Sequence, residues 1–154
     1  AVLHLTGQGG KVSVIPSTNV STMPLLCNIL MGWGLEFSVL LFENERENRT
    51  AEMLKETLFR TNTSDRPLII RMADHICNAE DLLSTLDFKN HILKMREGIT
   101  VPNSEYVREK EIPRSFMFSR FLTDVKAGII RMSDFDEETT ENFRMLADLM
   151  KDFK

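Results

Sequence analysis

Glutamates follow the most apolar run of the sequence. Residues 37–42 are nearly all apolar, and Glu43, Glu45 and Glu47 come directly after them. Such a run predicts a buried strand of a parallel sheet, and open α/β sheets bind ligands beyond the carboxyl ends of their strands. Glu43 and Glu45 point the same way if the strand continues, and carboxylate oxygens are ligands for hard cations such as Mg²⁺. These two residues are therefore candidate metal ligands.

The same glutamates also suit the start of a helix. The partial positive charge at a helix N-terminus stabilises acidic side chains in the first turn, and a helix is predicted to follow as far as about Arg60. On spacing alone this interpretation is favoured, because a short acidic motif carries little information.

Histidine, cysteine and glycine give no further site. His4, His75 and His91 show no ligand spacing with a cysteine, so no zinc site is predicted, and His4 is expected to be a packed strand residue. Cys27 and Cys77 lie far apart without a CxxC motif, which favours reduced thiols in a cytoplasmic protein. The glycines at 7, 9 and 10 match no phosphate-binding loop and predict a turn.

The elements that would position these side chains alternate along the first half of the chain. The expected strands are residues 2–5, 11–15, 37–42 and 67–72, and the expected helices begin near Pro24 and after Glu43. This rhythm predicts a parallel α/β sheet flanked by helices. Of the 19 basic and 23 acidic residues, only Lys11 lies in residues 1–34, so this part is expected to be the buried centre of the sheet.

The second half of the sequence predicts helices. Asn78 and Asp87 are expected to begin short ones, and Pro113 a helix that ends at Gly128. Ser133 with Asp136 is a variant capping pair before a last helix. The expected organisation is one domain over residues 1–154, with an α/β core in about 1–75 and a mainly helical remainder in about 76–154. The chain begins without methionine, so we expect a fragment of a longer protein.

Composition excludes several classes of protein. An apolar fraction of 42% and a charged fraction of 27% are typical of a folded domain, not of a disordered or membrane-spanning chain. A net charge of −4 argues against holding nucleic acid by bulk charge, although a local basic groove stays open. Phe116, Phe118 and Phe121 lie near Arg114 and Arg120, where base stacking is one interpretation. Core packing of Phe118, Phe121 and Val125 is the more economical one.

Three stretches of the chain carry a resemblance to a known family. The string from Val12 to Pro16, continued by residues 23–45, resembles the TOPRIM domain of overcoming-lysogenization-defect (OLD) family ATP-dependent endonucleases, a bacterial-type family. Residues 79–88 are similar to the acidic-aromatic segment of that family, and residues 112–122 are similar to its lysine-bearing helix. The resemblance covers most of the chain from about residue 11 onward and implies a TOPRIM or Rossmann-like fold.

The resemblance implies a nuclease in which acids and a lysine bind two divalent metals and cut DNA. Converging carboxylates in such sites stabilise the attacking and leaving oxygens. Here the family's aspartate pair falls on Phe42 and Asn44, its following glycine on Glu47, and its lysine on Arg114. The upstream glutamate would lie before residue 1. Phenylalanine cannot ligate a metal and asparagine is a weaker ligand than aspartate, so the resemblance implies a degenerate site.

Two functions from different classes follow. The first is a degenerate TOPRIM-like domain of a larger OLD-type protein, with an ATPase domain in the same longer chain, that serves assembly as a homo-oligomer or contact with DNA or protein. The alternative is an active Mg²⁺- or Mn²⁺-dependent DNA nuclease with Glu43, Glu45, Glu80 and Asp81 as ligands, Arg114 at the catalytic lysine position, and further residues from outside this chain. A third interpretation is a Rossmann-like interaction module that shares only the fold.

Overall fold

The computed structural model describes residues 1–7, 13–15, 19–60, 69–96 and 98–150. The chain divides into two compact units. We call Val14–Cys77 the sheet unit, and Ala1–Ser13 together with Asn78–Lys154 the helical unit. The division after Cys77 lies close to the point where the sequence changes from an α/β to a helical pattern.

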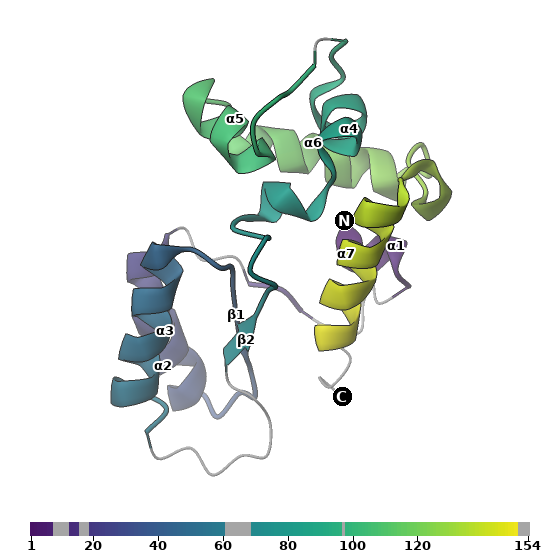
Figure 1. Ribbon diagram of the computed structural model, residues 1–154. Helices are drawn as coiled ribbons and strands as arrows, with labels where there is room; N and C mark the ends of the chain where they lie inside the picture. The colour runs from purple at the N-terminus through teal and green to yellow at the C-terminus, as the bar shows by residue number, and fades with distance from the viewer. Residues whose placement is uncertain (8–12, 16–18, 61–68, 97, 151–154) are drawn as a thin grey trace. The chain divides into compact units, whose positions relative to one another are not determined.

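The elements follow one another in an order that mixes helices with two short strands (Figure 1). They are α1 (Val2–Leu5), η1 (Val20–Thr22), α2 (Met23–Gly32), β1 (Val39–Leu41), α3 (Glu45–Thr57), β2 (Ile69–Arg71), η2 (Ala79–Leu82), α4 (Thr85–Asp87), η3 (Phe88–Leu93), α5 (Asn103–Glu109), α6 (Arg114–Lys126), η4 (Met132–Asp134) and α7 (Glu137–Leu149). The mixed α/β class and the helical C-terminal part are confirmed.

A parallel strand pair forms the centre of the sheet unit. β1 pairs with β2 in a register that places Val39 opposite Ile69 and Leu41 opposite Arg71. The two strands are joined through α3, so the predicted strand, helix and strand are confirmed, although both strands are shorter than predicted. Among the described residues the sheet has only these two strands, so β1 is not flanked by a strand on each side as a central strand would be.

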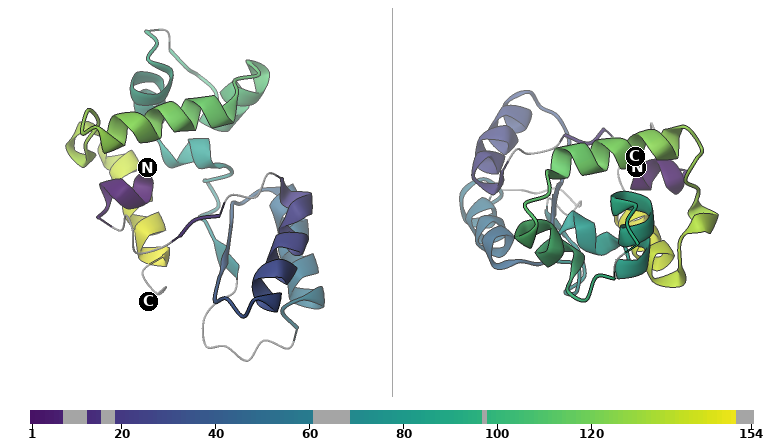
Figure 2. Two further views of the ribbon diagram at one scale, coloured as in Figure 1. Left: turned by 180° about the vertical axis from the view of Figure 1, so that it is seen from behind. Right: turned by 90° about the horizontal axis from the view of Figure 1, so that it is seen from above.

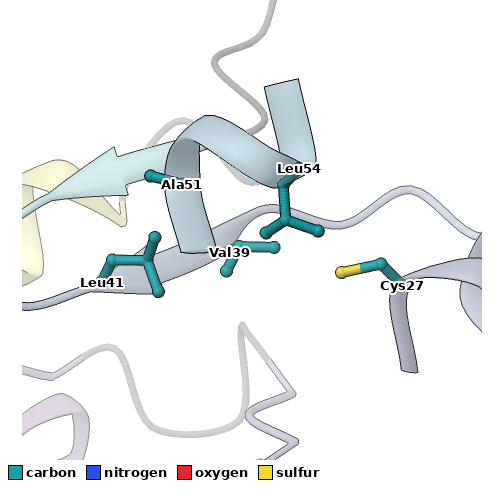
Figure 3. Packing of buried hydrophobic residues seen from close by; sticks show 5 residues of the cluster. All are labelled: Cys27, Val39, Leu41, Ala51 and Leu54. Carbon is teal, nitrogen blue, oxygen red and sulfur yellow. The ribbon is translucent and has the colours of Figure 1, made fainter. Parts of the chain in front are cut away.

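The core of the sheet unit lies between the strands and two helices. Cys27 of α2, Val39 and Leu41 of β1, and Ala51 and Leu54 of α3 are buried and pack together. Figure 3 shows Val39 and Leu41 on the strand beneath Ala51 and Leu54 of α3, with Cys27 reaching toward them from α2. Helices α2 and α3 lie on the same side of the strands, both in Figure 1 and in the view from behind in Figure 2.

The uncharged first part of the chain is less buried than the sequence predicts. Cys27 and Leu30 are buried, but Leu25 is 64% and Trp33 is 73% exposed. The expectation of a wholly buried centre was therefore wrong for α2. The physical reason is that only one face of this helix packs against the two short strands.

The first predicted strand is a helix. The amide of Leu5 donates to the carbonyl of Ala1 at 3.0 Å, and α1 ends before Gly7, whose φ is 74°. A run of four residues is too short for apolar periodicity to separate strand from helix, which is why the prediction failed. His4 is an exposed helical residue, not a packed strand residue. Of the second predicted strand, Ser13–Ile15 has no regular structure and residues 11 and 12 lie outside the described ranges.

The helical unit is organised around aromatic side chains. Three phenylalanines are buried: Phe121 of α6, Phe135 between η4 and α7, and Phe143 of α7. The Phe135 ring stands edge-on to both others, with centroids 6.3 Å from Phe121 and 5.2 Å from Phe143. Such edge-to-face pairs add to the free energy gained by burial. In this unit α1 packs against α6 and α7.

The ends of α6 match the sequence signals, and an earlier helix departs from them. Pro113 immediately precedes α6, and Gly128 follows it with a φ of 70°, as predicted. The helix predicted to begin at Asp87 begins instead at Thr85, continues as π-helix through Leu93 and ends at Lys94, whose φ is 54°. No helix in the described ranges combines the length and apolar character needed to cross a lipid bilayer.

Candidate functional site

The carboxyl ends of the two parallel strands carry a side-chain cluster. Arg71, the last residue of β2, forms an ion pair with Glu43, which lies two residues beyond β1. The Arg71 Nε donates to Glu43 Oε2 at 3.2 Å, and Nη2 donates to the same oxygen. Asn48 of α3 donates through Nδ2 to Glu43 Oε1 at 2.8 Å, and its Oδ1 accepts from Arg71. Both oxygens of Glu43 are therefore engaged.

The electrostatics of this cluster favour the ionised carboxylate. The hydrogen bond from Arg71 lowers the pKa of Glu43 from its ordinary value, and the bond from Asn48 lowers it further. The Glu43 side chain is 27% and the Arg71 side chain 31% exposed, so the pair lies at the surface of the sheet unit. The guanidinium of Arg71 thus contacts the carboxylate that the sequence suggested as a metal ligand.

The other positions of the acidic motif begin α3. Asn44 is the N-cap residue, and its Oδ1 accepts from the Glu47 amide at 3.0 Å while its Nδ2 donates to the Cys77 carbonyl at 2.9 Å. Glu47 accepts through Oε2 from the amide of Phe42 at 2.5 Å. Glu45 is exposed and pairs with Arg49 one turn along the helix. The helix-start interpretation therefore describes Glu45 and Glu47.

The second acidic pair belongs to the helical unit. The Glu80 side chain is 1% exposed and accepts from Arg114 Nε, whereas the Arg114 side chain is 52% exposed. Arg114 stands at the position where the resemblance places the family's lysine. The cation at this position is therefore paired with the Glu80 carboxylate. Burial makes this pairing necessary, because an ionised carboxylate without a partner is costly away from water.

Asp81 is fixed by backbone contacts instead. Its Oδ2 accepts from the Asn78 amide at 3.1 Å and its Oδ1 accepts from the Ser104 amide at 3.0 Å. The carboxylate thus binds the N-terminal amides of both η2 and α5. Asp81 therefore has a helix-capping role.

A buried amide lies next to this pair. Asn103 is 3% exposed, and its Nδ2 donates to the carbonyls of Glu80 at 3.0 Å and Leu83 at 2.7 Å. Its Oδ1 is the one buried side-chain oxygen or nitrogen among the described residues without a hydrogen-bond partner. No local sequence pattern singled out Asn103.

A polar network between α4 and α7 was also missed by sequence reasoning. Ser84 caps α4 by accepting from the Asp87 amide at 3.1 Å, and Asp136 caps α7 by accepting from the Thr139 amide at 2.9 Å. The Ser84 amide donates to Thr139 Oγ1 at 2.8 Å, and the Asp136 amide donates to Asp87 Oδ2 at 2.9 Å. In addition, Ser84 Oγ donates to Asp136 Oδ2.

The two caps are therefore reciprocal. In an ordinary capping box the fourth residue binds the backbone amide of its own cap, whereas here each binds the cap of the other helix. The predicted pair of Ser133 with Asp136 was wrong, because Ser133 Oγ lies 3.5 Å from Asp134 Oδ1 and Asp136 pairs with Ser84. The Ser-x-x-Asp and Asp-x-x-Thr spacings were visible, but their pairing was not.

Burial and hydrogen bonding act in opposite directions on Asp136. Burial raises its pKa, but the donors Ser84 and Thr139 stabilise the ionised form, and the net pKa is lowered from the ordinary value of 3.8.

The predicted metal ligands are divided between the units. Glu43 and Glu45 belong to the sheet unit, where they bind different partners, and Glu80 and Asp81 belong to the helical unit. Within the part of the chain that the structure describes, no three His, Cys, Asp or Glu side chains form a group that could hold a metal ion. The thiols of Cys27 and Cys77 are free.

Helix α6 has a buried and an exposed side. Met117, Phe121 and Val125 are buried, so core packing of Phe121 and Val125 is confirmed, while Phe118 is half-buried. Phe116 is 71% exposed. The three phenylalanines that the sequence grouped together thus lie in different environments.

No family model matches this chain, and no curated protein or solved structure is similar enough to it to count as a relative.

Proposed function

We propose that this chain is a degenerate TOPRIM-like domain of an OLD-type protein that binds nucleic acid or protein, or supports assembly, without cutting. The observation that carries the proposal is the Glu43 cluster. The carboxylate that follows β1 is held by the guanidinium of Arg71 and the amide of Asn48, at the strand ends where α/β folds bind ligands.

A divalent metal would have to displace these donors. Arg71 already neutralises Glu43, and its fork geometry suits a carboxylate. The neighbouring Asn44, which the resemblance aligns with a metal-binding aspartate, uses its Oδ1 for the Glu47 amide. The oxygen atoms of both residues are thus committed to contacts within the sheet unit.

The acidic pair of the helical unit supports the same proposal. Glu80 is neutralised by Arg114, and both oxygens of Asp81 accept backbone amides. These contacts are sufficient to explain why each acid is present, so no bound metal is required to balance their charge.

One observation favours the alternative of an active Mg²⁺- or Mn²⁺-dependent nuclease. Asn103 Oδ1 is buried without a donor, and amide and carboxylate oxygens are the ligands that these cations prefer. In that function Glu80 and Asp81 would exchange their present partners for the metal, and Arg114 would contact the scissile phosphate.

Plasmid nicking by the full chain with Mg²⁺ or Mn²⁺ tests the proposal, and we expect none above a preparation without metal. Titration calorimetry with each metal chloride is expected to show no saturable heat. Metal-dependent nicking that Glu80→Gln and Asp81→Asn both abolish would overturn the proposal. Glu52→Gln is the control, because Glu52 is an exposed glutamate of α3 that is not among the candidate metal ligands.

A further inference from the structure

We propose that the exposed face of α6 binds single-stranded nucleic acid. This face consists of Ser115, Phe116, Ser119, Arg120, Thr123 and Lys126, all of which are exposed. The inference rests on the proposed binding function and names its partner.

The first argument is the charge of this face. Arg120 and Lys126 are its charged residues, and α6 contains one acid, Asp124, whose side chain is only 14% exposed and pairs with Lys94 at 2.7 Å. Arg120 has no hydrogen bond or ion pair among the described residues. A surface with cations and no exposed acid is complementary to a phosphate backbone.

The other helices of 13 residues differ in this respect. The exposed side of α3 carries Glu52 and Glu56, and that of α7 carries Glu138 and Glu141. The chain as a whole is acidic, with a net charge of −4. The α6 face therefore differs from the exposed sides of α3 and α7 in carrying cations without an exposed acid.

The second argument is the exposed aromatic ring. Phe116 is 71% exposed, although the same helix buries Met117 and Phe121 on its other side. Phe116 and Arg120 are four residues apart and so are neighbours on the helix surface. A ring beside a cation matches the alternation of base and phosphate, because an unpaired base stacks on the ring while the phosphate meets the cation.

Hydroxyl side chains form the rest of the exposed face of α6. Ser119 and Thr123 lie between the ring and Lys126, and the Thr123 Oγ1 donates to the Ser119 carbonyl at 3.0 Å. Hydroxyl groups contact phosphate and sugar oxygens without reading sequence. A duplex hides its base faces in the stack, so Phe116 favours a single strand over a duplex.

The test is fluorescence anisotropy of labelled oligothymidylate with the full chain in EDTA. We expect saturable, salt-dependent binding that Phe116→Ala weakens roughly tenfold, because stacking on one ring has this magnitude. Arg120→Ala is expected to reduce the slope of log K against log salt by about 0.7, the value for one phosphate contact to a single strand.

The control variants are Leu86→Ala and Arg144→Ala. Leu86 is an apolar residue of the helical unit that is 55% exposed, and Arg144 is a cation on the exposed side of the acidic α7. Both are expected to bind like the unchanged chain. All substituted side chains are exposed, and circular dichroism checks that each variant is folded.

Several results would overturn the inference. They are the absence of saturable binding, equal binding of a duplex of the same length, equal competition by polyglutamate, or unchanged affinity of Phe116→Ala. Because EDTA removes divalent metal, failure here is separate from failure of the proposed function. Metal-dependent nicking that Glu80→Gln abolishes would overturn the latter and leave binding in EDTA unaffected.

Discussion

Each unit of the molecule holds a glutamate against an arginine, and the two pairs differ in burial. Glu43 and Arg71 of the sheet unit are both about one-third exposed, at 27% and 31%. Glu80 of the helical unit is 1% exposed, while its partner Arg114 is 52% exposed. Water can replace Arg71 around Glu43, but it cannot readily replace Arg114 around Glu80. We therefore expect the pair to matter little for stability in the sheet unit and much more in the helical unit.

The largest expected effect comes from removing the cation of the buried pair. Arg114→Ala leaves Glu80 buried without a counter-charge, and we expect the free energy of unfolding to fall by about 3 kcal/mol. Arg71→Ala is the matched variant in the sheet unit, where the released Glu43 hydrates and the unfolding midpoint hardly moves. Urea unfolding followed by circular dichroism measures both variants.

Equal destabilisation by the two arginine variants would contradict the contrast in burial. Glu80→Gln combined with Arg114→Ala separates the charge from the packing. We expect this double variant to recover part of the lost stability, because a neutral amide costs less to bury than an unpaired carboxylate.

A smaller effect is expected from the caps. Ser84→Ala removes the acceptor of the Asp87 amide and the donor to Asp136, and we expect a loss of about 2 kcal/mol. Asn44→Ala in the sheet unit removes a cap that is not reciprocal, together with the donor to the Cys77 carbonyl, and is expected to cost about 1 kcal/mol. Thermal unfolding ranks the two variants. A smaller loss for Ser84→Ala than for Asn44→Ala would mean that the reciprocal caps add nothing.

The smallest expected effect is on how the free energy of unfolding depends on pH. Asp136 and Glu43 both have a pKa lowered in the folded protein, so each stabilises the fold above its ordinary pKa. This stability is lost as the pH falls through the folded pKa. Between about pH 6 and about pH 3, stability should therefore fall less for Asp136→Asn than for the unchanged chain. Unfolding of both proteins in urea at each pH measures this difference, and identical acid profiles would show that Asp136 does not contribute.

Local signals in the sequence predicted many of the helix boundaries. Pro113 and Gly128 bound α6, and Asn78 precedes η2, because capping depends on residues within about one turn. The apolar run before Glu43 likewise predicted a strand, since its pattern is local. The four residues of α1 were assigned wrongly because they span too few positions to show a period.

Partners distant in sequence could not be predicted. Glu43 and Arg71 are 28 residues apart, and Ser84 and Asp136 are 52 residues apart. The neighbours of Glu43 in sequence allowed it to bind a metal or a helix end, but they did not point to Arg71. The sequence therefore left the metal-site and helix-start interpretations of the acidic motif open.

The sequence by itself determined the parallel strand pair with its connecting helix, the helical second half, and the ends of α6. The physical reason is that apolar periodicity, caps and breakers act over a few residues. Only the tertiary structure decided that Arg71 holds Glu43 and that Arg114 holds the buried Glu80. Burial and charge pairing depend on segments that folding brings together, and these set the free energy of each charge.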